Sequence, residues 1–284
     1  MWDNILTMGN ILGRDKQIAV TAALAEGNSI RSIERMTGIH RDTIMRLGLK
    51  IGQGCAALLD RKMRDLSCKR IQVDEIWSYV GKHDRFIQPE DDAQLGSVWT
   101  FCAIDSDTKI VPSYKIGKRD GATANAFMSD LASRLRNRIE LSSDGLAAYY
   151  DAVELAFGAD VDYSQVVKSY ASNDGAYSPE RKYKAPDFVS LSKYVVSGDP
   201  DLSRANTSHV ERLNATTRLH MKRMNRLTLA FSKKLENFEA AVALHFASYN
   251  FVRRHASLRM TPAMAAGITR DFWSYGELVE AANG

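Results

Sequence analysis

The stretch Arg70-Ile-Gln-Val-Asp-Glu-Ile-Trp-Ser-Tyr-Val80 decides the fold. It is rich in β-branched and aromatic residues, which favour a strand. Asp74 lies in the middle of this strand, where a charged side chain is costly unless it is paired or binds a metal ion. Glu75 follows, and because side chains alternate along a strand we expect it to point to the opposite face. Taken alone, Asp74 is equally compatible with an ion pair inside the sheet.

Further strands and helices follow this stretch in a recognisable order. Two more strand-like runs, at 97–105 and 109–117, complete a predicted antiparallel meander. A helical pattern at 122–135, a short strand at 138–144 and a helical pattern at 147–157 come next. Strands first, then strands alternating with helices, is the order of an RNase H-like fold. We therefore expect an α/β protein with an RNase H-like mixed sheet flanked by helices.

Two further acids occupy informative positions. Asp144 ends the short strand, at the carboxyl end where open α/β sheets place their ligands. A helix is predicted over 208–224, capped by Thr207 or Ser208, with Glu211 in its first turn. Residues 203–234 hold eight Lys or Arg and a single acid, Glu211. Such a carboxylate is either a simple ion-pair partner or a metal ligand beside bound phosphates.

The N-terminal part predicts a small all-α domain over 1–66. Helical patterns at 16–26, 30–36 and 40–50 are separated by short turns, with Ser29 as a candidate N-cap. Two short helices joined by a Gly-containing turn are the signature of a helix-turn-helix. An ordinary helical hairpin with solvated arginines is the alternative.

In a helix-turn-helix the second helix enters the DNA major groove, and its first turn meets the base edges. We expect Ile44 and Leu47 to pack inward. The expected DNA contacts are His40, Arg41, Thr43 and Arg46.

The charge of the chain is unevenly distributed. Residues 1–70 carry 12 Lys or Arg and 7 Asp or Glu, residues 71–202 carry 14 and 21, and residues 203–284 carry 12 and 6. Basic ends around an acidic middle suit a protein that grips a phosphate backbone and holds divalent cations at its centre. Surface solubility alone is an equally simple explanation of the same pattern.

The remaining composition excludes several classes of protein. The hydrophobic fraction is 45% and the charged fraction 25%, which is ordinary for a globular protein. No apolar run reaches the length of a membrane span and the N-terminus lacks a signal-peptide pattern, so we expect a cytoplasmic, nucleoid-associated protein without a membrane partner. The three scattered cysteines have no ligand spacing for a zinc knuckle, and we expect them to be small buried residues.

At these acids the sequence resembles the insertion-sequence-one family of DDE transposases. Coverage runs from about residue 70 to 272. The motifs are individually weak, but their shared order and spacing are specific. They are Val73-Asp-Glu-Ile-Trp-Ser-Tyr-Val80, Ser143-Asp-Gly145, His209-Val-Glu-Arg-Leu-Asn214 with Arg218, Phe231-Ser-Lys-Lys-Leu-Glu-Asn237, Tyr249-Asn-Phe-Val-Arg-Arg-His255 and Thr261-Pro-Ala-Met-Ala-Ala266.

The resemblance implies a catalytic domain over 67–284 with Asp74, Asp144 and Glu211 as the catalytic and metal-binding residues. Members often begin with a cysteine-rich zinc finger, which this sequence lacks, so recognition of DNA ends must rest on the helix-turn-helix. The segment 158–207 is expected to be an insertion before the catalytic helix. The expected DNA contacts around that helix are Arg212, Asn214, Arg218, Lys222 and Arg223.

The chemistry implied is metal-dependent cleavage and strand transfer at the ends of an insertion element. Two Mg²⁺ ions about 3.5–4 Å apart serve such a displacement, and Mn²⁺ is able to replace them. Hard cations prefer oxygen ligands, which suits Asp and Glu. The expected partners are double-stranded DNA, as inverted-repeat ends and as target, and further copies of the chain in a homodimer or higher oligomer. Two alternatives remain: an RNase H-like nuclease without joining activity, and a DNA-binding regulator with an inactive catalytic domain.

Overall fold

The computed structural model describes residues 12–170 and 187–284. Contacts divide the chain into two units, each assembled from separate stretches of sequence, so β1, β2 and α6 run from one unit into the other. The predicted boundary between residues 66 and 67 stays a prediction. The first unit comprises Met1–Lys62, Ser78–Ser97 and Thr216–Gly284, and the second comprises Met63–Trp77 and Val98–Ala215.

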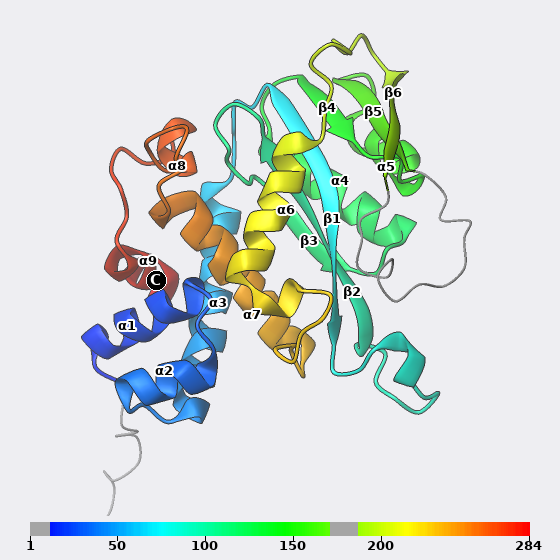
Figure 1. Ribbon diagram of the computed structural model, residues 1–284. Helices are drawn as coiled ribbons and strands as arrows, with labels where there is room; N and C mark the ends of the chain where they lie inside the picture. The colour runs from blue at the N-terminus through cyan, green and yellow to red at the C-terminus, as the bar shows by residue number, and fades with distance from the viewer. Residues whose placement is uncertain (1–11, 171–186) are drawn as a thin grey trace, which may run out of the picture. The chain divides into compact units, whose positions relative to one another are not determined.

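A six-stranded sheet with the order β3-β2-β1-β4-β5-β6 forms the second unit (Figure 1). β1 pairs in parallel with β4, and β4 in parallel with β5, whereas β2–β3 and β5–β6 are antiparallel pairs. This mixed sheet is the one expected, and its order is consistent with an RNase H-like fold. Its strands are β1 (Arg70–Val80), β2 (Gly96–Asp105), β3 (Tyr114–Gly117), β4 (Ile139–Ser143), β5 (Val161–Tyr170) and β6 (Phe188–Ser197).

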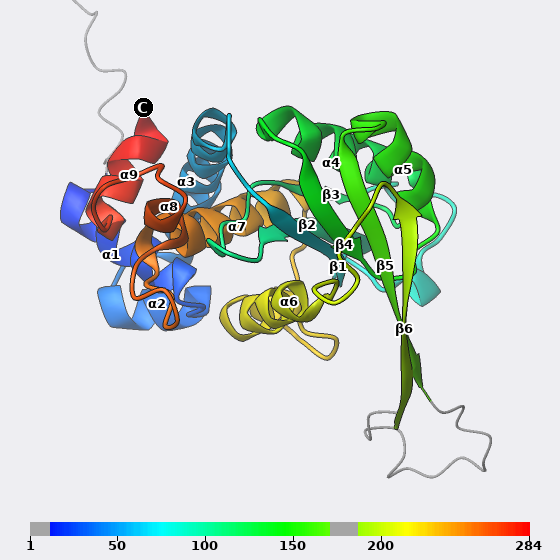
Figure 2. The ribbon, with the colours of Figure 1, turned by 90° about the horizontal axis from the view of Figure 1, so that it is seen from above.

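Helices cover both faces of this sheet. Figure 2 shows α4 (Gly121–Arg134) and α5 (Ala148–Phe157) on one face and α6 (Ser208–His220) on the other. The ring of Phe101 on β2 lies 5.8 Å from that of Phe127 and 6.1 Å from that of Tyr149, which ties both helices to the sheet through buried aromatic contacts. The predicted α/β architecture is therefore confirmed.

Two segments of the second unit differ from the prediction. The third strand is shorter than the expected 109–117, because Pro112 has no N–H for the ladder and Lys109 adopts a positive φ of 60°. Within 158–207, expected to be an insertion, β5 and β6 are strands of the same sheet. Residues 171–186 of that segment, like residues 1–11 of the predicted N-terminal domain, lie outside the described residues.

The first unit is helical in its described residues, apart from the strand ends that enter it. α3 continues well beyond the predicted end at residue 50, because its buried side packs on α7 and α9. Gly52 and Gly54 allow these close approaches, since a Cβ there would collide with the backbone carbonyls of Ala240 and Ala282. The α-helices are α1 (Arg14–Ala25), α2 (Ile30–Thr37), α3 (Arg41–Lys62), α7 (Leu235–Ala247), α8 (Pro262–Ala265) and α9 (Tyr275–Asn283).

The first three helices carry the predicted turn. The Ser29 hydroxyl caps α2 by accepting the Ser32 N–H at 3.1 Å, as predicted. Gly38 ends α2 in the left-handed region with φ 69°, which turns the chain into α3. Ile44 is buried and Leu47 packs against the same small cluster, as expected; the cluster is Val20, Ile33, Ile39 and Ile44.

The later helices end earlier than predicted. α6 stops at His220 instead of residue 224, because Met221 leaves the helical region with φ −123° and ψ 85°, and a short 3-10 turn follows at Lys222–Met224. The apolar spacing of Phe238, Val242, Phe246 and Tyr249 predicts one helix over 236–254. The structure has α7 there, followed by a π-helical turn at Ser248–Val252. No described helix is both long enough and apolar enough to cross a bilayer.

Candidate functional site

Three carboxyl groups of the second unit meet at one point. One oxygen from each of Asp74, Glu75 and Asp144 lies within 4.8 Å of the other two. Asp74 and Asp144 are therefore brought together as predicted, across 70 residues of sequence. Asp74 contacts Asn214 of α6 and Glu75 interacts with Tyr149 of α5, on opposite faces of the sheet, as alternation predicts. The carboxyls of Asp74 and Glu75 nevertheless meet at the end of β4. β1 is in register with β4 only at Arg70–Gln72, so beyond that point no β4 backbone separates the two carboxyls.

Arg119 lies against this acidic cluster of Asp74, Glu75 and Asp144. The Arg119 guanidinium is 3.3 Å from Glu75 Oε2 and 4.0 Å from Asp144 Oδ2. It also stacks over the Trp99 ring, at 5.0 Å from the centroid, which helps to hold it in place. Three ionised carboxylates and one guanidinium leave a net charge of about −2, which a divalent cation would balance.

Burial makes this negative charge costly. Burial raises the pKa of Asp74 to about 6, and the charges of Asp144 and Glu211 add to the shift. Burial likewise raises the pKa of Glu75 to about 7, with a further contribution from Asp144. The hydroxyl of buried Tyr149 interacts with Glu75, and burial together with that charge raises the pKa of Tyr149 well above its usual value. Carboxylates that repel one another in a half-buried place fit a hard cation with oxygen ligands.

Asn214 of α6 is a hydrogen-bond partner of Asp74. Its Nδ2 donates to Asp74 Oδ2 at 2.7 Å, and its Oδ1 accepts from Cys102 Sγ at 3.3 Å. The side chain is buried, with 3% exposed. The hydrogen bond from Asn214 lowers the pKa of Asp74 and partly offsets the effect of burial. Asn214 was predicted to contact DNA. Its side chain instead faces the sheet and contacts the acidic cluster at Asp74.

Glu211 lies near the cluster without joining it. Its charge contributes to the raised pKa of Asp74, so the two carboxyls interact electrostatically. The Glu211 carboxylate itself forms an ion pair with Lys168 of β5 and accepts a hydrogen bond from the Thr207 hydroxyl at 2.6 Å. Of the three predicted catalytic acids, Asp74 and Asp144 meet in one cluster, and Glu211 interacts with Asp74 through its charge.

The predicted DNA contacts along and after α6 differ in exposure. Arg212 and Lys222 are exposed, and Arg218 is partly buried. The Arg223 guanidinium points into the first unit, where it donates to Ser232 Oγ at 2.7 Å and to the Asn237 carbonyl at 3.1 Å. Its hydrogen bonds inside the protein give it a structural role.

The predicted contacts of the N-terminal helices lie at the start of α3. His40, Arg41 and Arg46 are exposed, and Thr43 is half-buried. Arg46 donates to the Asp42 carbonyl at 3.3 Å, which leaves most of its guanidinium available to solvent. The exposure of these side chains is compatible with DNA contact, and their role in DNA contact stays a prediction.

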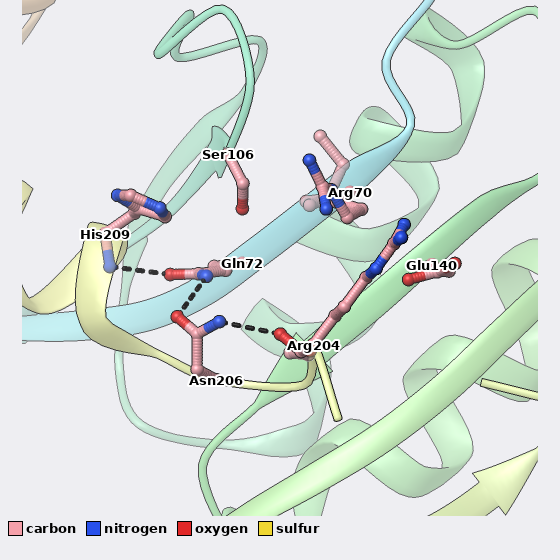
Figure 3. A pocket seen from close by; sticks show the side chains of 9 residues that line it. Arg70, Gln72, Ser106, Glu140, Arg204, Asn206 and His209 are labelled. Carbon is pink, nitrogen blue, oxygen red and sulfur yellow. Dashed lines mark hydrogen bonds between the residues drawn. The ribbon is translucent and has the colours of Figure 1, made fainter. Parts of the chain in front are cut away.

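Sequence reasoning missed Glu75 and Arg119 as parts of the site. Alternation along β1 does not indicate that the Glu75 carboxyl meets that of Asp74 at the end of β4. Arg119 lies in a loop before α4, where nothing in the sequence marks it. It also missed Gln72, which lies two residues before Asp74 on the same strand. Gln72 lines a polar pocket of about 110 Å³ together with Arg70, Arg204 and His209 (Figure 3).

No protein-family model matches the chain, and no curated protein matches it in sequence. Several solved structures to which the chain is similar are transposases. The piggyBac transposase in a synaptic complex with hairpin DNA is 8% identical, with a TM-score of 0.44 over 95% of this chain and 70% of that chain. The Mos1 transposase paired-end complex with the left transposon end is 14% identical, with a TM-score of 0.21 over 54% of this chain and 60% of that chain. The Mos1 strand transfer complex is 11% identical, with a TM-score of 0.24 over 87% and 80%.

Proposed function

We propose that the chain is a DDE-type transposase of the insertion-sequence-one kind, which binds the ends of an insertion element and catalyses metal-dependent cleavage and strand transfer of DNA. One observation supports this above all: Asp74 and Asp144, two acids singled out from sequence alone, converge within 4.8 Å together with Glu75. The strand order of the sheet and the sequence motifs around all three proposed acids agree with the proposal.

In this proposal Asp74, Asp144 and Glu211 would hold two Mg²⁺ ions, or Mn²⁺ in their place, and Glu75 is a further carboxylate close to Asp74 and Asp144. Such ions supply charge neutralisation for an in-line phosphoryl displacement at the DNA backbone. The residues around the acids keep the donors in place. Asn214 orients Asp74 through its 2.7 Å hydrogen bond, and the ion pair with Lys168 holds Glu211 at the start of α6.

Arg119 would have a second task at the same site. Its guanidinium already neutralises part of the charge on Glu75 and Asp144. A planar guanidinium also matches a phosphate group in shape and hydrogen bonding. We assign Arg119 to the approach of the scissile phosphate, because it is half-exposed beside the acids.

The remaining contacts follow the basic surfaces. Arg212, Arg218 and Lys222 would hold phosphates near the site, and Arg41, Thr43 and Arg46 would read the element's ends. Two ends must be cut and joined together, which favours a homodimer or higher oligomer on double-stranded DNA. The activity would place the protein on the chromosome in the cytoplasm.

The test uses a DNA fragment that carries the short inverted repeats flanking the gene. Wild-type protein with Mg²⁺ or Mn²⁺ is expected to nick this fragment at the repeat ends and to form joined products. Asp144→Asn is expected to lose at least about 10²-fold in rate, because a metal-binding oxygen is replaced. Asp151→Asn is the matched control, since Asp151 is exposed on α5 and outside the cluster.

Each outcome separates one alternative. Cleavage without joined products would identify a nuclease, and binding without cleavage under any divalent cation would identify an inactive DNA-binding regulator. Cleavage by Asp144→Asn at the wild-type rate would overturn the assignment of the acids.

A further inference from the structure

Gln72 is buried on β1, and its side-chain amide forms three hydrogen bonds. Its Oε1 accepts the backbone N–H of His209 at 2.8 Å, and its Nε2 donates to Asn206 Oδ1 at 2.8 Å (Figure 3). The same Oε1 also accepts the backbone N–H of Val210 at 3.1 Å. Only 3% of the residue is exposed. The first N–H groups of a helix have no partner within the helix, so a strand residue here satisfies two of them at the start of α6.

This contact lies on the same strand face as Asp74. Side chains alternate along a strand, so Gln72 and Asp74 share a face and stand roughly 6.6 Å apart along β1. The two contacts of α6 with these residues come from Val210 and Asn214, which are four residues or about 6 Å apart along the helix. The spacing on the strand therefore nearly equals the spacing on the helix.

Two contacts at matched spacing fix a helix more firmly than one. The Gln72 bonds prevent α6 from sliding along β1, and the bond from Asn214 to Asp74 sets its rotation. Glu211 lies between these contact points, one residue after Val210. Its distance from Asp74 is therefore set by the same pair of strand residues.

We propose that Gln72 is a positioning residue of the acidic site, which fixes the first turn of α6 on β1 and so sets Glu211 relative to Asp74. The proposal rests on the proposed function of that site. It differs from an ordinary capping role, because a cap contributes stability without affecting the geometry of a distant carboxylate pair.

The test replaces Gln72 with a residue of similar size and no hydrogen-bonding groups. Gln72→Met removes all three hydrogen bonds, and Gln165→Met is the matched control. Gln165 is equally buried at 3% in the same sheet and donates to the Tyr163 hydroxyl on its own strand. Gln72→Asn is a milder second variant, which keeps the amide but is one methylene too short to make the same bonds unless α6 moves.

Three measurements are made on protein shown to be folded by circular dichroism. For both Gln72 variants we expect kcat for DNA cleavage to fall about 10-fold or more with little change in KM, and Mn²⁺ affinity measured by calorimetry to fall about 10-fold, as for other residues that orient metal ligands. Hydrogen exchange at the backbone amides of His209 and Val210 should accelerate. Gln165→Met should stay within about 2-fold of wild type in kcat and in Mn²⁺ affinity.

The outcomes separate this proposal from the proposed function. If the wild type cleaves DNA and a folded Gln72→Met or Gln72→Asn protein matches it in kcat and Mn²⁺ affinity, the positioning role is wrong and the proposed function stands. If Gln165→Met loses as much as Gln72→Met, the effect is one of general stability and the positioning role is again wrong. A wild type that neither binds Mn²⁺ nor cleaves DNA overturns both.

Discussion

Removing the charge of Glu75 should change how the stability of the protein depends on pH. Burial raises the pKa of Glu75 from its usual 4.5 to about 7 in the folded protein. A carboxyl with a raised pKa binds its proton more tightly when folded than when unfolded. Stability is therefore lost as the pH rises from the unfolded pKa to the folded one. The window for Glu75 runs from about pH 4.5 to 7.

The amount of stability lost follows from the shift in the pKa of Glu75. A change of about 2.5 pKa units corresponds to about 3 kcal/mol, of which roughly 2 kcal/mol falls between pH 5 and 8. Glu75→Gln keeps the shape of the side chain and cannot ionise. Urea unfolding in EDTA, followed by tryptophan fluorescence at the two pH values, gives the free energy of unfolding of each protein. From pH 5 to pH 8, the free energy of unfolding of the wild type should fall by about 2 kcal/mol more than that of Glu75→Gln.

Glu154→Gln provides the control, because Glu154 is exposed on α5 and should leave the pH dependence unchanged. An identical pH dependence in wild type and Glu75→Gln would refute the reasoning. It would mean that the carboxyl is solvated or paired well enough to keep its usual pKa. A larger loss of stability in the variant than in the wild type would contradict the predicted direction of the effect.

Three further predictions concern other parts of the molecule. Asn214→Ala should weaken Mn²⁺ binding about 10-fold in calorimetry, because the ligand carboxylate loses its buried hydrogen bond, and unchanged affinity would contradict this. Gly52→Ala should lower the free energy of unfolding by more than about 2 kcal/mol, since its Cβ meets the Ala240 carbonyl. Gly121→Ala, with nothing within 4 Å of the added atom, should not destabilise the protein, and an equal loss in both variants would count against the packing argument. Ser29→Ala should cost about 1 kcal/mol in urea unfolding by removing the N-cap of α2, and a change below about 0.3 kcal/mol would show the cap to be unimportant.

Much of the fold was predictable because it depends on local pattern. The β-branched run from Arg70 to Val80 predicts β1, and Ser29 with Gly38 predicts the turn between the first helices. Element ends were less predictable. Met221 ends α6 through a backbone conformation that no local residue type announces. The place of β5 and β6 in the sheet depends on pairing between segments, which a pattern within one segment does not contain.

The site was predictable in its acids and not in their surroundings. Asp74 and Asp144 stand out because a charge in or at the end of a buried strand is costly. Glu75 lies on the face that alternation predicts, but its carboxyl meets that of Asp74 where β4 ends, and the pattern of β1 alone does not show this. Arg119 and Gln72 act through contacts with residues far away in sequence, so neither the spacing nor the residue type reveals them.

The most direct measurement of the central claim is an anomalous difference map from crystals of the protein soaked in Mn²⁺. The account predicts a peak between the carboxylates of Asp74 and Asp144, with an oxygen of Glu211 or Glu75 completing the ligand set. The same map from Asp144→Asn crystals should lack that peak. Wild-type crystals that show no manganese at these carboxylates, or manganese bound only elsewhere on the protein, would contradict the account.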